Sequence, residues 1–351
     1  MFLHALNTSV PELALSQKEC AELVQRSRLR ERLKRRSLLT LLAILRGESG
    51  IAKRHFALSE VERLFDYSAD ELNAAFRREA PVLAGRALRA ALDSAGLVPR
   101  DLDALLVCTC TGYLCPGVSS YVSEQFGMRD NALLQDLVGL GCGAAVPMLR
   151  SADALLARHP GATIATVAVE ICSAAFYIDD DPGVLISACL FGDGAAAAIW
   201  KSTPPADGPA LRCRAFNTLH QPEHRDRIRF EQRDGRLRNL LDLKLPGFAA
   251  TAVDRLWNEA TARGPEPARV ISHGGGRDVL DALQQVLPRH DLGASRKTLR
   301  DYGNMSSPSV LFTLEEALRE GAPQPGTDWW LVSFGAGFSV HDCRFGSTDA
   351  L

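Results

Sequence analysis

The sequence predicts an α/β protein whose sheets lie inside the molecule and are covered by helices on both faces. Short, mostly apolar runs at 105–108, 164–169 and 329–333 indicate buried strands. Segments in which apolar residues recur every three or four positions lie between them and indicate helices. Strands that are apolar on both faces belong to internal sheets, so this alternation favours an α/β fold with a large core.

Length and composition suit a globular protein. The 351 residues correspond to about two domains, and 46% apolar with 23% charged residues is a typical globular mixture. A net charge of −2 gives no support to a nucleic-acid or bulk membrane partner. We see no signal peptide and no apolar run that could span a bilayer, and nine scattered cysteines suit free thiols, so we expect a cytoplasmic protein.

The N-terminal region is predicted to be helical and basic. Ser16 and Glu19 have the spacing of a capping box, and a strongly basic helix is expected over 26–36. Its charges are opposed only by Glu31 and come from Arg26, Arg28, Arg30, Arg32, Lys34, Arg35 and Arg36. A solvated surface helix is the simpler interpretation. The alternative is an entrance patch for an anionic ligand, such as a phosphate-bearing carrier.

Strand–helix units continue to the C-terminus. Helices are expected at 69–97, 118–126, 185–190, 247–263, 277–286 and after Pro308, and strands at 105–110, 133–134, 164–169, 195–200, 270–272, 329–333 and 338–343. The segment from Pro204 to Pro209 is the clearest linker. We therefore divide the chain into 1–203 and 210–351, two halves built from similar units.

Cys142 has the context of a nucleophile. Glycine stands on both sides of it, and an apolar helical run follows. Glycine permits a tight turn and the close approach of a ligand. Because a helix N-terminus favours a thiolate, we expect the pKa of this thiol to be lowered. A buried structural cysteine in a glycine-rich turn is the alternative.

His273 and Asn304 have a context like that of Cys142. His273 ends an apolar strand before three glycines, and Asn304 follows Gly303 and opens a helix. Strand and helix ends of this kind can converge on one crevice. The histidine would assist thiolate formation, and both side chains would donate hydrogen bonds to a developing oxyanion.

The stretches 141–143, 190–196, 273–275, 303–307 and 334–337 together resemble the bacterial-type type III polyketide synthases, in the chalcone and stilbene synthase family. The loop 111–117 also matches, and the resemblance extends from about residue 6 to 340. It implies a thiolase-like, five-layered αβαβα fold made of two similar halves. The N-terminal half would carry the nucleophile, and the C-terminal half the histidine and asparagine.

The resemblance also implies the chemistry. Cys142 would accept an acyl starter, and His273 and Asn304 would stabilise the enolate formed when malonyl-CoA loses carbon dioxide. Repeated decarboxylative Claisen condensations and a cyclisation would follow. Malonyl-CoA and acyl-CoA would be substrates, with no permanently bound cofactor. The family is homodimeric, and Cys115 would lie near the dyad.

The resemblance also assigns expected cavity positions to individual residues of this sequence. Phe191 matches a gatekeeping phenylalanine, with core packing as the alternative, and the other expected substrate-binding residues are Cys110, Cys172, Ala175, Ser187, Ser306, Gly335 and Gly337. Several cavity positions differ from the plant enzymes, and Ala336 replaces a common proline. A second gatekeeping phenylalanine has no clear counterpart near Arg238 and Asn239. The product is therefore not predicted.

Carrier contacts are expected from Arg46, Lys53 and Arg54, which lie in the region where the family binds CoA phosphates. The basic segment 26–36 departs from the plant pattern. It could serve CoA or an acyl carrier protein, whose surface is acidic.

Three rival interpretations were weighed. Cys108, Cys110 and Cys115 lack a fourth ligand at a zinc-like spacing, so no metal is expected. A β-ketoacyl carrier-protein synthase III, which performs one condensation, typically continues its histidine motif with Gln-Ala-Asn, whereas glycines follow His273 here. A catalytically silent partner subunit is disfavoured by the intact Cys142, His273 and Asn304.

Overall fold

The computed structural model describes residues 1–206 and 210–347. The predicted linker extends into 207–209, which lie outside the described residues. The division of the chain at 203 and 210 therefore stays a prediction.

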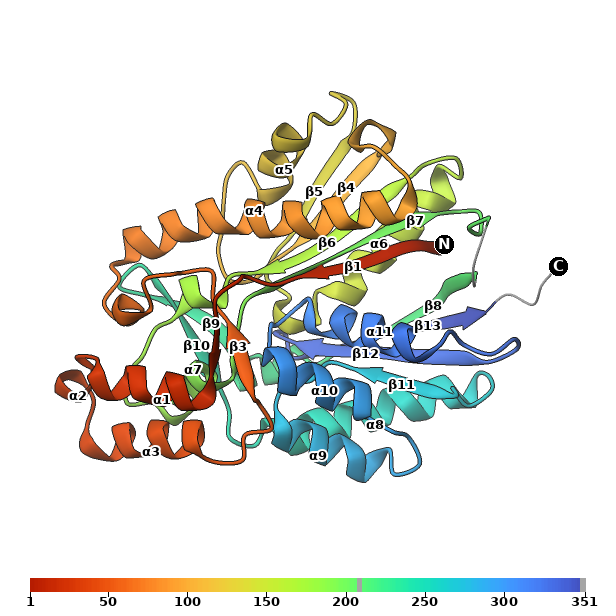
Figure 1. Cartoon of the computed structure of the whole chain (residues 1–351). Coiled ribbons are helices and arrows are strands. Elements are labelled where there is room, and N and C mark those ends of the chain that lie inside the picture. Colours follow the sequence, from red (N-terminus) through yellow and green to blue (C-terminus); the bar gives the residue numbers. More distant parts are fainter. Residues whose placement is uncertain (207–209, 348–351) are drawn as a thin grey trace.

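Elements before this linker are the following (Figure 1). They are β1 (Phe2–Ser9), β2 (Ala14–Ser16), α1 (Gln17–Arg26), α2 (Leu29–Arg32), α3 (Arg35–Arg46), β3 (Lys53–His55), the 3-10 helix η1 (Val61–Arg63), α4 (Ala69–Ala95), η2 (Pro99–Asp101), β4 (Ala104–Cys108), α5 (Val118–Phe126), β5 (Leu133–Leu137), η3 (Gly141–Gly143), α6 (Ala145–Arg158), β6 (Ile164–Glu170), η4 (Cys172–Ala175), α7 (Pro182–Leu190) and β7 (Gly194–Lys201).

Elements after the linker complete the fold. They are β8 (Leu211–His220), η5 (Pro222–Arg227), β9 (Ile228–Arg233), β10 (Arg236–Leu241), α8 (Leu245–Ala262), β11 (Arg269–Ser272), α9 (Arg277–Val286), α10 (Gly293–Tyr302), α11 (Ser309–Glu320), β12 (Asp328–Gly335) and β13 (Ser339–Ser347).

The main sheet has the strand order β11-β12-β13-β8-β1-β7-β6-β4-β5. β1 and β8 join through the single register pair of Phe2 and Arg212. Outward from this join, β1-β7-β6-β4 and β8-β13-β12-β11 have the same pattern of two antiparallel pairings and one parallel pairing. The sheet is therefore two similar half-sheets, to which β5 adds one strand at an edge.

Helices α6 and α11 lie between the half-sheets, because each contacts strands of both: α6 touches β4, β6, β12 and β13, and α11 touches β1, β7, β11 and β12. Helices α4 and α5 cover the outer face of one half-sheet, and α8 covers that of the other, with α9 packed on α8. The expected five-layered αβαβα arrangement is confirmed. Successive side chains of β6 point to opposite faces of the sheet, so that both faces are covered. Val167 packs toward α4, whereas Ile164 and Ala168 belong to the core around α6.

The basic segment 26–36 is not one helix, which corrects the expectation. α1 ends at Arg26, the short α2 follows, and α3 begins at Arg35. The breaks at Ser27 and Leu33 have extended backbone, and they turn Leu29 and Leu33 into the core. A continuous helix would also have placed like charges four residues apart, which is unfavourable. The predicted capping box of Ser16 and Glu19 is confirmed at the start of α1.

Within the described residues, none of the helices combines the length and apolar character needed to cross a bilayer.

Candidate active site

Cys142 lies in the one-turn helix η3, immediately before α6. Gly141 has a φ of 57°, in the left-handed region that favours glycine. A Cβ on Gly143 would lie 3.2 Å from the backbone nitrogen of Gly335 at the end of β12. The two flanking glycines therefore serve a tight turn and a close approach of β12 to the nucleophile.

The side-chain amide of Asn304 is held in one orientation by two backbone groups. Nδ2 donates a hydrogen bond to the Gly275 carbonyl at 3.0 Å, and Oδ1 accepts one from the Ser306 N–H at 2.7 Å. The loop needs an unusual backbone, with φ of 72° at Gly303 and 60° at Ser306. Since an amide nitrogen carries two hydrogens, one remains to donate to a ligand.

His273 follows β11 and is anchored to β12. Its N–H donates to the Val332 carbonyl at 2.9 Å, and its ring packs edge-on against Phe334 with 5.2 Å between centroids. The side chain is buried, and within the described chain its Nδ1 has no hydrogen-bond partner. Leaving a buried polar atom unpaired is costly, which is typical of a functional side chain.

The three residues converge at one end of β12. His273 packs on Phe334, and a Cβ on the next residue, Gly335, would lie 2.9 Å from the backbone nitrogen of Cys142. Asn304 forms a backbone bridge with Phe191, which lines the same cavity as Cys142. The structure thus brings together segments that are up to 162 residues apart (Cys142 and Asn304), although the roles of these residues stay a proposal.

Burial dominates the electrostatics of this site. It raises the pKa of the Cys142 thiol to about 12, outweighing a hydrogen bond with Ser306 that acts to lower this pKa. It lowers the pKa of His273 to about 4. The expected lowering of the thiol pKa is therefore wrong in direction for this structure. The imidazole of His273 is therefore neutral near pH 7.

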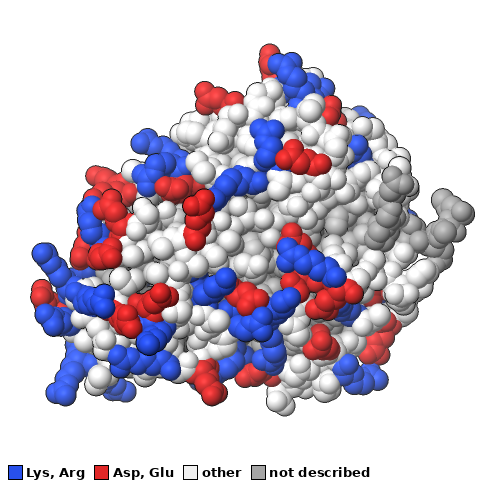
Figure 2. All heavy atoms as spheres, in the orientation of Figure 1, with Lys and Arg blue, Asp and Glu red and all other residues white. Residues whose placement is uncertain are grey.

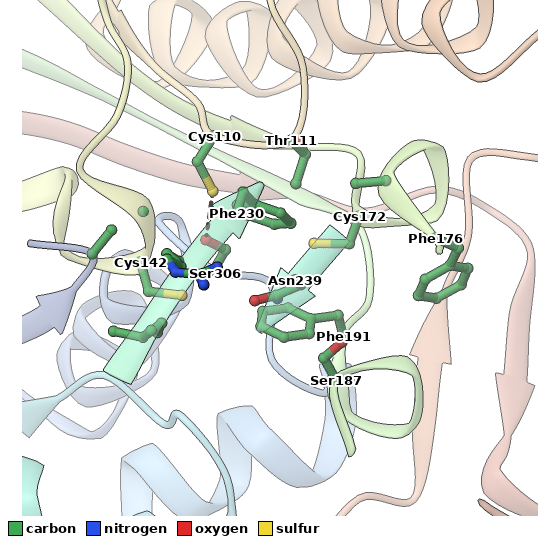
Figure 3. A pocket seen from close by; sticks show the side chains of 15 residues that line it. Cys110, Thr111, Cys142, Cys172, Phe176, Ser187, Phe191, Phe230, Asn239 and Ser306 are labelled. Carbon is green, nitrogen blue, oxygen red and sulfur yellow. Dashed lines mark hydrogen bonds between the residues drawn. The ribbon is translucent and has the colours of Figure 1, made fainter. Parts of the chain in front are cut away.

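Cys142 lines a partly open cavity whose empty space, with the solvent at its mouth, is about 500 Å³ (Figure 3), and His273 and Asn304 are not among its lining residues. Six of the eight predicted substrate-binding residues line it: Cys110, Cys172, Ala175, Ser187, Phe191 and Ser306. Gly335 and Gly337 do not, and only Ala336 between them reaches the cavity. Gly335 packs against the backbone around Cys142 instead, since a Cβ there would lie 2.4 Å from the Gly143 nitrogen.

The hairpin of β9 and β10 supplies a wall that the sequence did not predict. Phe230 and Asn239 are register partners on its two strands, and both line the cavity. The sequence shows no second gatekeeping phenylalanine near Asn239 on β10. The structure places Phe230 opposite it, on the neighbouring strand β9. Arg238 holds the hairpin in place through ion pairs with Asp179 at 2.8 Å and Glu231 at 2.9 Å. The alternation of apolar and polar residues over 228–241 is the sequence signal that could have predicted this hairpin.

Glu170 is a second residue that the sequence analysis missed. It is fully buried at the end of β6. One carboxylate oxygen accepts hydrogen bonds from Thr109, Cys110 and Thr111, and the other accepts from Ser307 Oγ at 2.6 Å. Glu170 therefore ties the loop of Cys110 to the loop of Asn304. A carboxylate closing a strand of apolar residues was the signal that could have found it.

Arg54 does not fit the expected carrier contact. Its side chain is buried, and Nη1 donates to the carbonyls of Ala188 at 2.8 Å and Phe191 at 2.9 Å, while Nε donates to Gln17. A guanidinium enclosed in this way positions the Phe191 segment and is not free to reach a phosphate at the surface. Arg46 and Lys53 are exposed and stay candidates.

A second, larger hollow of about 1340 Å³ lies on the other side of Gly275. Its walls come from α3, α7, the segment before α8 and the start of α9, and include Ile44, Leu190, Leu243 and Arg277. We call it the entrance groove. The Gly275 carbonyl binds Asn304, so the groove reaches the catalytic asparagine candidate from the surface. In the described part of the chain, no group of three or more acidic, histidine or cysteine side chains is arranged to hold a metal ion.

Comparisons with known proteins agree with this geometry. Residues 8–213 match the family described as FAE1/Type III polyketide synthase-like protein, and residues 252–345 match the chalcone and stilbene synthases, C-terminal domain. The 3,5-dihydroxyphenylacetyl-CoA synthase of Streptomyces toyocaensis is 32% identical over 83% of this chain and 79% of its own length.

Two further comparisons concern one other enzyme. The 1,3,6,8-tetrahydroxynaphthalene synthase of Streptomyces coelicolor is 28% identical over 95% of this chain and 89% of its own length. The crystal structure of the enzyme of that name from this species, a bacterial type III polyketide synthase, superposes with a TM-score of 0.90 at 26% identity, covering 100% of both chains. The family matches span both halves of the molecule, so the chain belongs to the type III polyketide synthases of the chalcone and stilbene synthase family and is an acyltransferase with the thiolase fold.

Proposed function

We propose that this enzyme holds an acyl starter on Cys142, extends it repeatedly with malonyl units and cyclises the product in the cavity that Cys142 lines. One observation carries this proposal: the buried thiol lines a largely apolar cavity, the buried imidazole of His273 packs on Phe334 next to the glycine that contacts the Cys142 backbone, and the Asn304 amide is fixed by Gly275. Such a site can form a thioester, stabilise a developing negative charge and exclude water.

Acylation begins the cycle. Sγ of Cys142 attacks the carbonyl of an acyl-CoA while the neutral imidazole of His273 takes the thiol proton. The bond between the carbonyl carbon and the sulfur of CoA breaks, and CoA leaves as its thiol after receiving a proton. The backbone N–H of Cys142, in the turn before α6, supports the oxyanion.

Decarboxylation supplies the next nucleophile. Malonyl-CoA loses carbon dioxide, and the electron pair of the broken C–C bond becomes an enolate whose negative charge lies on the thioester oxygen. The free N–H of Asn304 and the imidazole of His273 would donate hydrogen bonds to that oxygen. The enolate carbon then attacks the acyl group on Cys142 and releases the thiolate, so that the chain grows by two carbons.

The cavity limits the growing chain. Cys110, Cys172 and Ala175 are small, whereas Phe191, which follows α7, and Phe230, which lies on β9, are bulky (Figure 3). Two of the similar proteins named above make, by their names, dihydroxyphenylacetyl and tetrahydroxynaphthalene compounds. Together these facts support a small polyhydroxylated aromatic product.

The entrance groove is the proposed route for CoA thioesters. It leads from the surface to Gly275, and the candidate contacts for the phosphates, Arg46 and Lys53, are exposed residues outside its lining. All nine cysteines are free, as expected for a protein of a reducing cytoplasm.

A homodimer is the proposed assembly. β5 is an edge strand, and Leu133, Leu134 and Val138 are exposed on or beside it, as is Tyr113 in the loop that holds Cys115. Exposed edge strands with apolar side chains are usually covered by a partner. Analytical ultracentrifugation tests this, and a monomer at micromolar concentration would contradict it.

The function is tested with malonyl-CoA alone and with a panel of acyl-CoA starters. Mass spectrometry of the products should show compounds that contain two or more malonyl-derived units. A single condensation would favour the β-ketoacyl synthase III alternative. Neither acylation of Cys142 nor release of carbon dioxide with any starter would favour the silent partner subunit.

A further inference from the structure

Positive charge is concentrated on one corner of a molecule whose net charge is −2. The segment 26–36 carries seven basic residues and one acidic residue. The structure places them on the end of α1, on α2 and on the first turn of α3. Figure 2 shows Lys and Arg side chains gathered at the end of the molecule where these helices lie. We call six exposed members of this cluster the basic face, leaving out Arg32, which is exposed but pairs with Asp66 at 3.4 Å: Arg26, Arg28, Arg30, Lys34, Arg35 and Arg36.

Most of this charge is not neutralised. Arg26 has a carboxylate at 3.9 Å and Lys34 has one at 3.8 Å. Among the residues that the structure describes, the other four arginines of the basic face have no carboxylate within ion-pair distance. Six like charges on neighbouring turns repel one another, so the basic face is electrostatically prepared for an anionic partner.

Three of these positive charges stand at the N-terminus of α3, where they are unfavourable for the helix. Lys34 is its N-cap and Arg35 and Arg36 are in its first turn, whereas the first turn itself has no acidic residue and one carboxylate from elsewhere, Asp180, accepts a hydrogen bond from the Lys34 N–H at 2.9 Å. The N-terminus of a helix is its positive end, so three cations at this position oppose the helix dipole. Local helix stability therefore does not explain the pattern, whereas recognition of an anion would.

The same helix connects the basic face to the entrance groove. Thr40, Ala43, Ile44 and Gly47 line the groove, so the second half of α3 forms its wall. The 12 residues of α3 span roughly 18 Å, which places the basic face about one helix length from the groove. Leu39 lies between the two and is 57% exposed. A partner that covers the basic face would also cover this leucine.

The groove itself does not provide the matching charge for a polyphosphate. Its ionisable lining residues are Glu48, Asp242 and Asp278 against Arg277 alone. The positive charge of this region therefore lies on the basic face and not in the groove. A small anionic ligand in the groove would meet few of these arginines, whereas a folded acidic protein beside the groove would meet most of them.

We propose that the basic face is a docking surface for an acidic acyl carrier protein, whose phosphopantetheine arm enters the groove and delivers acyl groups to Cys142. This inference rests on the proposed function, because it assumes that Cys142 is acylated from a thioester. Charge complementarity selects the partner, and the groove admits the flexible arm. CoA and the carrier protein then offer the same thioester to the same thiol, and only the carrier needs the basic face.

The experiment compares two donors of one acyl group. Hexanoyl-CoA and the hexanoyl form of a bacterial fatty-acid carrier protein are mixed with the enzyme, and acylation of Cys142 is followed by intact mass. The test variant is Arg28→Gln/Arg30→Gln/Arg35→Gln, which spares Arg36 nearest the groove. The matched control is Arg77→Gln/Arg100→Gln/Arg158→Gln, which removes three exposed charges from α4, η2 and α6.

We expect the test variant to lose about tenfold or more in kcat/KM for the carrier-protein donor at low salt and less than about twofold for hexanoyl-CoA. The control should change neither, and 0.3 M salt should weaken the wild-type reaction with the carrier protein. Equal losses with both donors would assign the face to CoA and overturn the inference. It is also overturned if the variant loses nothing, or loses only binding to phosphatidylglycerol vesicles. Acylation by neither donor would instead refute the proposed function.

Discussion

The two halves of the molecule place chemistry at comparable points. Cys110 follows β4 and His273 follows β11, and these strands are the parallel partners of β6 and β12. Cys142 stands just before α6, and Asn304 stands just before α11. α6 and α11 are the two helices between the half-sheets. Each half therefore contributes one pair of side chains at equivalent points: Cys110 and Cys142 from the N-terminal half, and His273 and Asn304 from the C-terminal half.

The pairs differ in kind. The N-terminal half supplies sulfur and small apolar groups, whereas the C-terminal half supplies the nitrogen donors His273 and Asn304. This difference suggests a division of labour, with covalent attachment in one half and charge stabilisation in the other. β5 has no counterpart in the C-terminal half, and it is the strand after which the chain reaches Cys142. The predictions below test this division.

Cys142→Ala should have the largest effect. Chain growth should fall by at least about 10³-fold, because the variant removes the proposed attachment point of the acyl group. Release of carbon dioxide from malonyl-CoA should persist in part, since its stabilising groups belong to the other half. Labelled malonyl-CoA reports both. Cys110→Ala removes a thiol from the same cavity and should keep most activity. Wild-type amounts of product from Cys142→Ala would remove the nucleophile assignment.

Asn304→Ala should show the opposite pattern. Decarboxylation should fall by about 10²–10³-fold, the usual loss for one oxyanion donor, while acylation of Cys142 changes little. Asn239→Ala serves as control, because that amide lines the cavity from the hairpin and has no proposed role in enolate formation. If decarboxylation survived in Asn304→Ala while acylation was lost, the division between the halves would be wrong.

These two residues also show what a sequence can reveal. Glycines beside Cys142, His273 and Asn304 mark places where the backbone turns sharply, and the apolar runs define the strands that end there. Local patterns of this kind predicted an α/β protein with covered internal sheets and a crevice at which the three residues could converge, whereas the five-layered arrangement was implied by the family resemblance. The hairpin wall and Glu170 depend on contacts between distant segments, and no local pattern specifies which segments meet.

Burial is the other quantity that the sequence did not provide. Arg54 stands in a basic cluster and was expected at the surface, yet the packing of α7 and β3 encloses it. The pKa of Cys142 was expected to fall at a helix terminus, but desolvation in the finished core raises it. Neither the family region of Arg54 nor the helix terminus of Cys142 reveals burial, because desolvation is set by the packing of the whole molecule.

Glu170→Gln tests the contact that joins the halves. The carboxylate accepts from the Cys110 loop on one oxygen and from Ser307 on the other, and an amide would point two hydrogens at donors. The free energy of unfolding should drop by about 3 kcal/mol in urea titrations. Glu266→Gln, at an exposed carboxylate, should change it by less than about 0.5 kcal/mol. An unchanged midpoint for Glu170→Gln would show that the halves do not depend on this contact.

The smallest effect expected is that of mild acid on the acylation of Cys142. Burial lowers the pKa of His273 to about 4, so its neutral, proton-accepting form should persist as the pH falls from 8 to 6. The thiol, whose pKa is raised to about 12, stays protonated over the same range and adds no titration of its own. Single-turnover acylation by an acyl-CoA should therefore change by less than about twofold between pH 8 and 6 and fall only in stronger acid. Circular dichroism at each pH separates this loss from unfolding. A decline centred near pH 6.5 would mean that the imidazole titrates as if it were exposed to solvent. The C-terminal half would then not hold a buried base, and the proposed division between the halves would be wrong.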